Sequence, residues 1–152
     1  MLNSSRLCLR ALVPSDLNAI YLGWLNDPEV NRYLETRFLP QTQEALQAYW
    51  QAHRDDPAGP WFAICLAADG RHIGNIKLCP IQWLHCRGDL SLFIGDRGCW
   101  VQSFASEAIG FARDWGLSEL DLNKLTVFIY SDNVESRRVL RSAGTDSRVT
   151  AR

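Results

Sequence analysis

One junction in the chain joins the pattern of a half-buried strand to the start of a strongly amphipathic helix. Residues 89–94 alternate polar and apolar side chains, Gly95 to Gly98 follow as a turn, and the helix begins within Trp100 to Ala105. A strand that enters a helix through a tight turn directs several backbone N–H groups at one point, where the helix dipole adds positive potential. This junction therefore predicts a phosphate-binding site.

The junction contains neither of two familiar phosphate-binding motifs. The pattern G-x-x-x-x-G-K-[ST] is absent, and so is G-x-G-x-x-G. On physical grounds alone, a plain helix start explains the residues as well as a phosphate site does.

A second candidate segment is Asn133-Val-Glu-Ser136, which follows a predicted strand ending at Tyr130. By itself, an Asn three residues before a Ser at a helix start most simply indicates a loop and a helix cap. The chemistry of this segment depends on what lies beside it in the fold.

Both segments resemble the acetyl-CoA-binding half of the GNAT N-acetyltransferases. That family carries Q/R-x-x-G-x-G/A at the strand-to-helix junction, and one branch, which includes ribosomal-protein N-terminal and amino-sugar N-acetyltransferases, has W-G-x-G-[YF]-A-[ST]-E-A. The chain matches this pattern at Trp100, Phe104, Ala105, Ser106, Glu107 and Ala108. It departs at Val101 and Ser103, where glycine is usual because glycine permits a positive φ and a close approach of phosphate.

The resemblance implies a coenzyme site made largely of backbone amides. The pyrophosphate of coenzyme A would lie on the amides of Val101, Gln102, Ser103, Phe104, Ala105 and Ser106. A backbone N–H at Phe93 or Ile94 would stabilise the oxyanion of the thioester. Asn133 and Arg138 would contact the coenzyme. A solvated helix face is the simpler explanation of the basic cluster at residues 137, 138 and 141, but one of these arginines, with Arg97 or Lys124, could instead pair with the ribose phosphate of coenzyme A.

Residues 124–144 resemble the family's second motif, which supplies catalytic groups. Ser136 matches a serine that contacts the thioester sulfur in the N-terminal acetyltransferase branch, and Leu140 stands where many relatives have a proton-donating tyrosine. Asp89 is the best candidate for a general base, because it lies on the strand that would hold the thioester. A solvated charge at a strand edge explains Asp89 equally well.

Composition limits the classes of protein that the chain can belong to. A length of 152 residues predicts a single domain, residues 1–152, and a formal charge of -1 argues against nucleic-acid binding. No segment has the pattern of a signal peptide or a membrane span. The five cysteines contain no C-x-x-C pair, which indicates reduced thiols in a cytoplasmic protein. The spacings of His72, Cys79, His85 and Cys86 fit no structural zinc site, so no metal is expected.

Periodicity predicts the elements that position these residues. Strands are expected at residues 6–13, 61–67, 72–78, 89–94 and 125–130, with an Asp69-Gly70 hairpin turn between the second and third. Helices are expected after the Pro14-Ser15-Asp16 start signal, up to about Leu34, after Thr42, after the turn at 95–98, and at 134–143. The inner face of the first would hold Leu17, Ile20, Tyr21, Trp24 and Leu25, and that of the third Ala45, Leu46, Tyr49 and Trp50.

The predicted fold is an α/β domain with a mixed central sheet and flanking helices, as the GNAT resemblance implies. The unit from residue 89 to 130 should be a right-handed crossover that joins parallel strands. The resemblance ends near Gly144, and residues 146–152 are too few for the two further strands that usually complete the sheet. A missing final hairpin would leave an unpaired edge strand and an open acceptor pocket.

The function that the resemblance implies is N-acetyl transfer from acetyl-CoA to a primary amine, an amino sugar or a protein N-terminus, without an acyl-enzyme. Two alternatives stay open: a degenerate relative that binds acyl-CoA without transferring the group, and an interaction module without coenzyme. The amine acceptor would be a small molecule or a peptide, and the protein a monomer or a homodimer.

Overall fold

The computed structural model describes residues 2–130, 133–142 and 147–150. They form a seven-stranded sheet whose strands lie in chain order. The strands are β1 (Leu2–Asn3), β2 (Leu7–Ala11), β3 (Trp61–Leu66), β4 (His72–Gln82), β5 (Arg87–Ile94), β6 (Lys124–Tyr130) and β7 (Ser147–Thr150). Neighbours from β1 to β5 are antiparallel, whereas β5–β6 and β6–β7 are parallel.

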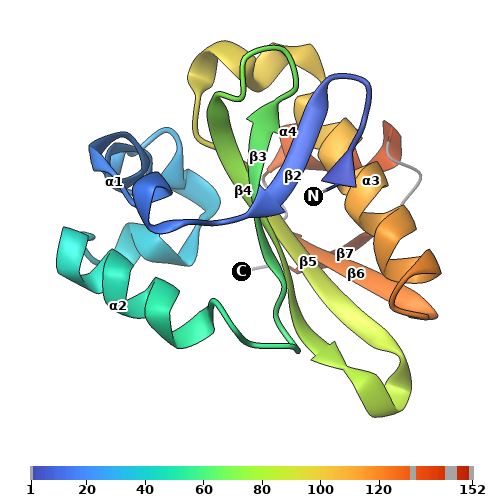
Figure 1. Ribbon diagram of the computed structural model, residues 1–152. Helices are drawn as coiled ribbons and strands as arrows, with labels where there is room; N and C mark the ends of the chain where they lie inside the picture. The colour runs from blue at the N-terminus through green and yellow to red at the C-terminus, as the bar shows by residue number, and fades with distance from the viewer. Residues whose placement is uncertain (1, 131–132, 143–146, 151–152) are drawn as a thin grey trace.

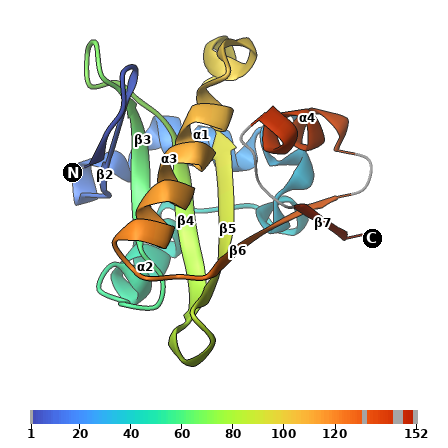
Figure 2. The same ribbon diagram turned by 90° about the vertical axis from the view of Figure 1, so that its right-hand side faces the viewer.

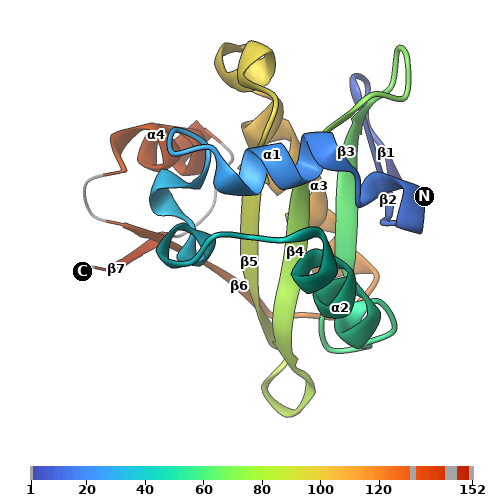
Figure 3. The same ribbon diagram turned by 90° about the vertical axis from the view of Figure 1, so that its left-hand side faces the viewer.

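Four helices flank the sheet. They are α1 (Ala19–Asn26), α2 (Gln43–His53), α3 (Phe104–Ser118) and α4 (Val134–Ser142). Helices α1 and α2 cover one face (Figures 1 and 3), and α3 covers the other (Figure 2). The hydroxyl of Ser106 on α3 lies 3.4 Å from the carbonyl oxygen of Val139 on α4, so α4 packs beside α3.

Capping side chains set the starts of α1 and α2. Asn18 accepts hydrogen bonds from the N–H groups of Ile20 and Tyr21 and is therefore the N-cap of α1. The helix start predicted from residues 14–16 was too early. Thr42 caps α2 as predicted, through the N–H of Ala45. The segment between these helices forms two short 3₁₀ turns, Asn31–Tyr33 and Glu35–Phe38, in place of the predicted second helix.

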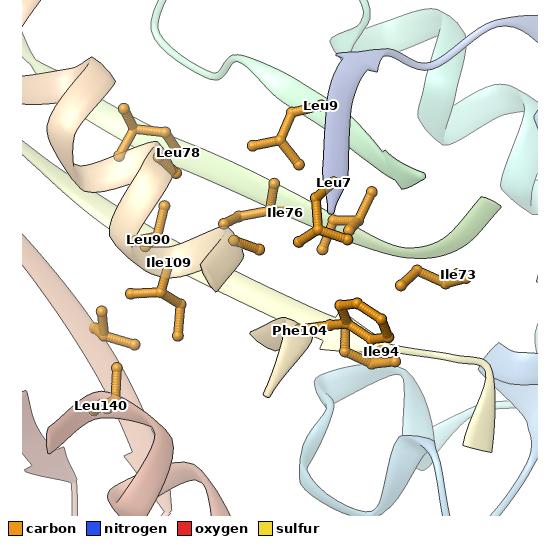
Figure 4. Packing of buried hydrophobic residues seen from close by; sticks show 14 of the residues in the cluster. Leu7, Leu9, Ile73, Ile76, Leu78, Leu90, Ile94, Phe104, Ile109 and Leu140 are labelled. Atoms are coloured by element: carbon orange, nitrogen blue, oxygen red, sulfur yellow. The ribbon is translucent and has the colours of Figure 1, made fainter. Parts of the chain in front are cut away.

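The hydrophobic core lies on both faces of the sheet. The cluster under α3 includes Leu90 and Ile94 of β5, Phe104 and Ile109 of α3, and Leu140 of α4 (Figure 4). A smaller cluster under α1 and α2 includes Tyr21, Leu25, Leu46 and Trp50, all from the predicted inner faces. Ile20 was predicted to be inside and is 67% exposed, because α1 starts later than the pattern suggested.

The crossover β5–α3–β6 joins parallel strands as predicted. The expectation that β6 would be an unpaired edge strand is wrong. Strand β7 pairs with it from Val127↔Ser147 to Tyr130↔Thr150. The prediction assumed that the residues left after the last helix were too few to form a strand, but a four-residue segment is enough to cover that edge. The described residues supply one strand after α4, not the two that are usual in the family.

Candidate active site

The site lies where the parallel strands β5 and β6 separate. They pair from Arg87↔Lys124 to Leu90↔Val127, and no pairing continues beyond that point. The last four residues of β5 therefore leave β6, and the ribbons diverge from there (Figures 2 and 3). A parallel pair that separates within the sheet leaves backbone groups of both strands available to a ligand.

Antiparallel pairing with β4 fixes the direction of the N–H groups of β5 in this gap. Ile94 lies opposite Gly74, and the N–H of the next residue, Gly95, donates to the carbonyl of Ile73 at 2.8 Å. Because donors alternate along an antiparallel strand, the N–H of Phe93 faces β4 and that of Ile94 faces the gap toward β6. Of the two predicted oxyanion donors, Ile94 has the required direction and Phe93 does not.

Helix α3 follows β5 in the chain, and a 3₁₀ turn, Arg97–Gln102, connects them. The connection is therefore longer than the predicted four-residue turn. Ser103 is the N-cap residue of α3, and its side chain makes no capping hydrogen bond. The amides that open α3, at Phe104 and Ala105, are thus left without a side-chain cap, which is the arrangement that binds anions at a helix N-terminus.

The backbone at Ser103 explains why relatives have glycine there. Its φ is +59°, in the left-handed region that glycine adopts without strain. Ser103 therefore keeps the conformation that a glycine would favour. Val101, the other departure, is 93% exposed, so the fold accommodates its β-branched side chain in solvent.

A polar cluster links this junction to the N-terminal hairpin. The carboxylate of Glu107 accepts hydrogen bonds from the hydroxyl of Ser4 at 2.6 Å and from the guanidinium of Arg6 at 2.7 Å. Arg6 also donates to the carbonyl of Gln102 and stacks on the ring of Phe104. Burial by itself would raise the pKa of Glu107, but the bonds from Ser4 and Arg6 outweigh it and lower the pKa. The Glu of the matched motif therefore holds the helix start in place.

Residues of α4 take separate roles in helix capping and in the core. The side chain of Asn133 accepts a hydrogen bond from the N–H of Ser136 at 3.0 Å, so Asn133 caps the helix. The hydroxyl of Ser136 forms no hydrogen bond with any residue that the structure describes. Leu140 is buried in the core, where it fills the tyrosine position with an apolar side chain.

The predicted cations differ in their surroundings. Arg97 forms ion pairs with Asp27 at 2.5 Å and Glu29 at 3.0 Å, so it is engaged by the loop after α1. Arg138 on α4 and Lys124 at the start of β6 are both exposed. Only Arg138 comes from the helix that packs beside α3, which makes it the better placed of the two for the coenzyme.

A cavity of about 830 Å³ opens on the other face of the sheet, against the end of β5. Its floor is formed by β4 and β5, and its walls by α1, α2 and the 3₁₀ turns between them. Aromatic side chains make up much of the lining: Tyr21, Tyr33, Tyr49, Trp61, Phe93 and Phe128. Phe128 belongs to the part of β6 that has left β5, so the cavity reaches the gap between the two strands.

Sequence patterns did not identify most of these lining residues as functional. Asn75, Lys77 and Ser91 lie in segments predicted as ordinary strands, and Glu35 and Thr36 follow the predicted second helix, which was expected to end at about Leu34. The one feature of the sequence that pointed to these residues was the predicted inner face of α2, which included Ala45 and Tyr49. Both residues line this cavity instead of the core.

Asp89 is not among the residues that line the cavity. It lies on β5 opposite Thr126, within the part that still pairs with β6. Burial raises the pKa of its carboxyl group, with Arg87 opposing that shift. Side chains alternate along a strand, so Asp89 points to the same face of β5 as Ser91 and Phe93, which line the cavity. Asp89 precedes Ser91, the first lining residue of β5, by two residues.

Within the described residues, no three side chains of the His, Cys, Asp or Glu types gather as a metal site would require. No helix in the same ranges combines the length and apolar character that crossing a membrane would take.

Comparison with known proteins places this arrangement in a family. Residues 6–146 match the acetyltransferase (GNAT) domain. The chain is 27% identical over 146 residues to YoaA of Bacillus subtilis (strain 168), an uncharacterised N-acetyltransferase, covering 95% of this chain and 81% of that protein. It is 28% identical over 144 residues to p20 of Bacillus licheniformis, also an uncharacterised N-acetyltransferase, covering 93% and 79%.

A solved structure has the same fold. Spermidine N-acetyltransferase from Vibrio cholerae, in complex with CoA and spermine, superposes with a TM-score of 0.81 at 23% identity, over 93% of this chain and 81% of that one. The family match over residues 6–146 defines an acetyltransferase class of protein. The chain belongs to the GNAT acetyltransferase family.

Proposed function

We propose that the protein transfers an acetyl group from acetyl-CoA to a primary amine at the gap between β5 and β6. The observation that carries this proposal is the end of strand pairing at Leu90↔Val127, with the uncapped start of α3 on one side and the aromatic cavity on the other. The coenzyme's pyrophosphate would lie on the amides from Val101 to Ser106, and the amine would enter through the cavity. Amino sugars and protein N-termini are candidate acceptors.

The chain's own groups would stabilise the reaction at three points. The N–H of Ile94 faces the gap and would donate to the oxyanion that forms when the amine attacks the thioester carbonyl. The hydroxyl of Ser136 would donate to the leaving sulfur. The cavity would hold the amine at the carbonyl carbon, which reduces the entropic cost of the encounter. In this proposal Asp89 would act as the general base, and Asn133 and Arg138 would contact the coenzyme.

Spermidine is a further candidate acceptor, because the Vibrio cholerae protein is a spermidine N-acetyltransferase. A cavity lined by one carboxylate among its described residues, Glu35, gives a polycation few partners. We therefore rank polyamines below acceptors with fewer positive charges.

Acetyl-CoA is expected to raise the melting temperature, because a ligand that binds the folded state stabilises it by mass action. At 100 times its dissociation constant the gain is roughly 2.7 kcal/mol. Differential scanning fluorimetry across a coenzyme titration measures the shift, with free adenosine as a control that lacks the pyrophosphate and pantetheine. An unchanged melting temperature at millimolar acetyl-CoA would refute the proposed coenzyme site.

Restoring the family's glycines should tighten coenzyme binding if Cβ atoms crowd the phosphates. In a helix interior, Ser103→Gly would cost up to about 1 kcal/mol. The φ of +59° reverses that expectation, and we expect Ser103→Gly to gain about 1 kcal/mol of stability. Calorimetry on Ser103→Gly, Val101→Gly and the double variant separates the two sites. If the double variant binds acetyl-CoA no more tightly than the wild type, crowding does not limit affinity.

A further inference from the structure

The cavity contains one lysine whose charge is not balanced by a carboxylate. Lys77 lies on β4 opposite Ser91, and both residues line the cavity. Its ammonium donates to the hydroxyl of Tyr49 at 3.0 Å and lies 5.0 Å and 5.5 Å from the ring centroids of Tyr49 and Trp61. Among the described residues, no carboxylate lies within ion-pair distance of it.

This environment holds the ammonium in place without neutralising it. The two rings attract a cation through their faces, which fixes the side chain over the cavity floor. An ammonium has three N–H donors, and the Tyr49 hydroxyl takes one. The other two remain available to a ligand in the cavity.

Two of the described residues that line the cavity also carry buried polar atoms without hydrogen-bond partners. Across the described residues, two buried side-chain atoms have no hydrogen-bond partner, Asn75 Nδ2 and Thr36 Oγ1, and both belong to residues that line this cavity. The oxygen of the Asn75 side chain lies 3.0 Å from His72 Nε2, so the donor end of the amide is the one left over. Folded proteins leave few such atoms unpaired, and their presence in one cavity indicates a ligand with hydrogen-bonding groups.

We infer that the acceptor is a small amine that also carries a carboxylate, and that Lys77 binds this carboxylate; the inference rests on the proposed function. One lysine matches a singly charged anion, whereas phosphate groups are held by several donors, as at a helix N-terminus. Ser91, opposite Lys77, is three residues from Ile94, the proposed oxyanion donor. Three residues of strand span roughly 10 Å. The carboxylate and the neutral attacking amine of one small molecule can therefore reach Lys77 and the thioester together when several bonds separate them. The aromatic walls suit an acceptor with an apolar or aromatic body.

Matched pairs of primary amines test this inference. Each pair consists of an amino acid and its carboxamide in which several bonds separate the amine from the carboxyl carbon, for example 4-(aminomethyl)benzoate and 4-(aminomethyl)benzamide, and 6-aminohexanoate and 6-aminohexanamide, with spermidine as a polycationic comparison. At this separation the carboxamide changes the pKa of the amine little, so both members of a pair offer a similar fraction of neutral amine. Acetyl transfer is measured as kcat/KM by mass spectrometry for the wild type, Lys77→Met and Lys77→Arg. Arg113→Met serves as the control, because it removes one positive charge from α3, across the sheet from the cavity.

We expect the wild type to favour the carboxylate member of a pair by about tenfold or more, as a charge-assisted hydrogen bond would give. Lys77→Met should abolish this preference, Lys77→Arg should keep part of it, and Arg113→Met should leave it unchanged. Equal or better use of the carboxamides or of spermidine by the wild type would overturn the inference, and so would a preference that persists in Lys77→Met.

A binding measurement separates this inference from the proposed function. Calorimetry with the same pairs, in the presence of CoA, reports carboxylate recognition without any transfer. Binding that favours the carboxylates and depends on Lys77, without turnover of any amine, would support carboxylate recognition by Lys77 and reject the transferase. Turnover without a carboxylate preference would support the transferase and reject carboxylate recognition by Lys77. If no carboxylate binds better than its carboxamide, the inference is wrong whether or not transfer occurs.

Discussion

Ser136→Ala is expected to lower kcat by on the order of 100-fold while leaving the KM for acetyl-CoA nearly unchanged. A hydroxyl that donates to sulfur as the thiolate forms acts in the transition state and not on the bound substrate. Loss of such a proton donor typically costs about 100-fold or more in rate. Because the effect is confined to the transition state, kcat and kcat/KM should fall together.

The structure makes this substitution a clean test. The helix cap is the side chain of Asn133, which accepts from the N–H of Ser136, so Ser136→Ala keeps the capping bond. Its stability should therefore stay close to that of the wild type. Asn133→Ala is the matched reference for capping, and it should lose about 1 kcal/mol in urea denaturation. A stable Ser136→Ala with wild-type turnover would remove this hydroxyl from the mechanism and leave water or the substrate as the proton source.

Gly74→Ala is expected to destabilise the fold by about 2 kcal/mol and to lower kcat at least about tenfold. A Cβ at this position would lie 2.3 Å from the carbonyl oxygen of Phe93 and 2.9 Å from the Cα of Ile94. These are backbone atoms of β5, so the strand must move, and overpacking of this kind costs about 1–3 kcal/mol. The displaced residue is the proposed oxyanion donor, whose complete loss costs about 100-fold or more.

Gly110→Ala is the control for a glycine replacement that meets no obstacle. Gly110 lies inside α3, and an added Cβ would have no atom within 4 Å. The helix should gain up to about 1 kcal/mol, with no change in kcat. Denaturation and kinetics on both variants compare the two glycines directly. Wild-type kcat in a destabilised Gly74→Ala would show that the position of Ile94 is not critical for the reaction.

The sequence predicted those parts of the site that depend on local pattern. The strand at 89–94, the helix that follows it and the cap at Asn133 each have a signature within a few residues. The same local pattern predicts anion binding at the α3 start. The family resemblance suggested Phe93 or Ile94 as the oxyanion donor, but it did not give the direction of their N–H groups. That direction depends on the register with β4, which a single sequence does not encode locally.

The acceptor cavity could not be predicted in this way. Its lining comes from α1, α2, the 3₁₀ turns, β3, β4, β5 and β6, so residues such as Tyr33 and Lys77 come together only in the folded chain. Tyr49 has the spacing of a core residue on α2 and borders the cavity instead. Strand β7 was missed because four residues give no periodic signal. Side chains that recognise a ligand follow from tertiary contacts, which sequence periodicity does not report.

The central claim is direct transfer of an acetyl group to an amine at the gap between β5 and β6. Initial velocities of CoA release, with acetyl-CoA and the amine varied together, test it most directly. The amine should be required, and double-reciprocal lines should intersect, because both substrates must be bound before the acetyl group moves. Parallel lines would indicate a covalent acyl-enzyme and contradict direct transfer, and CoA release that does not depend on the amine would contradict the transferase itself.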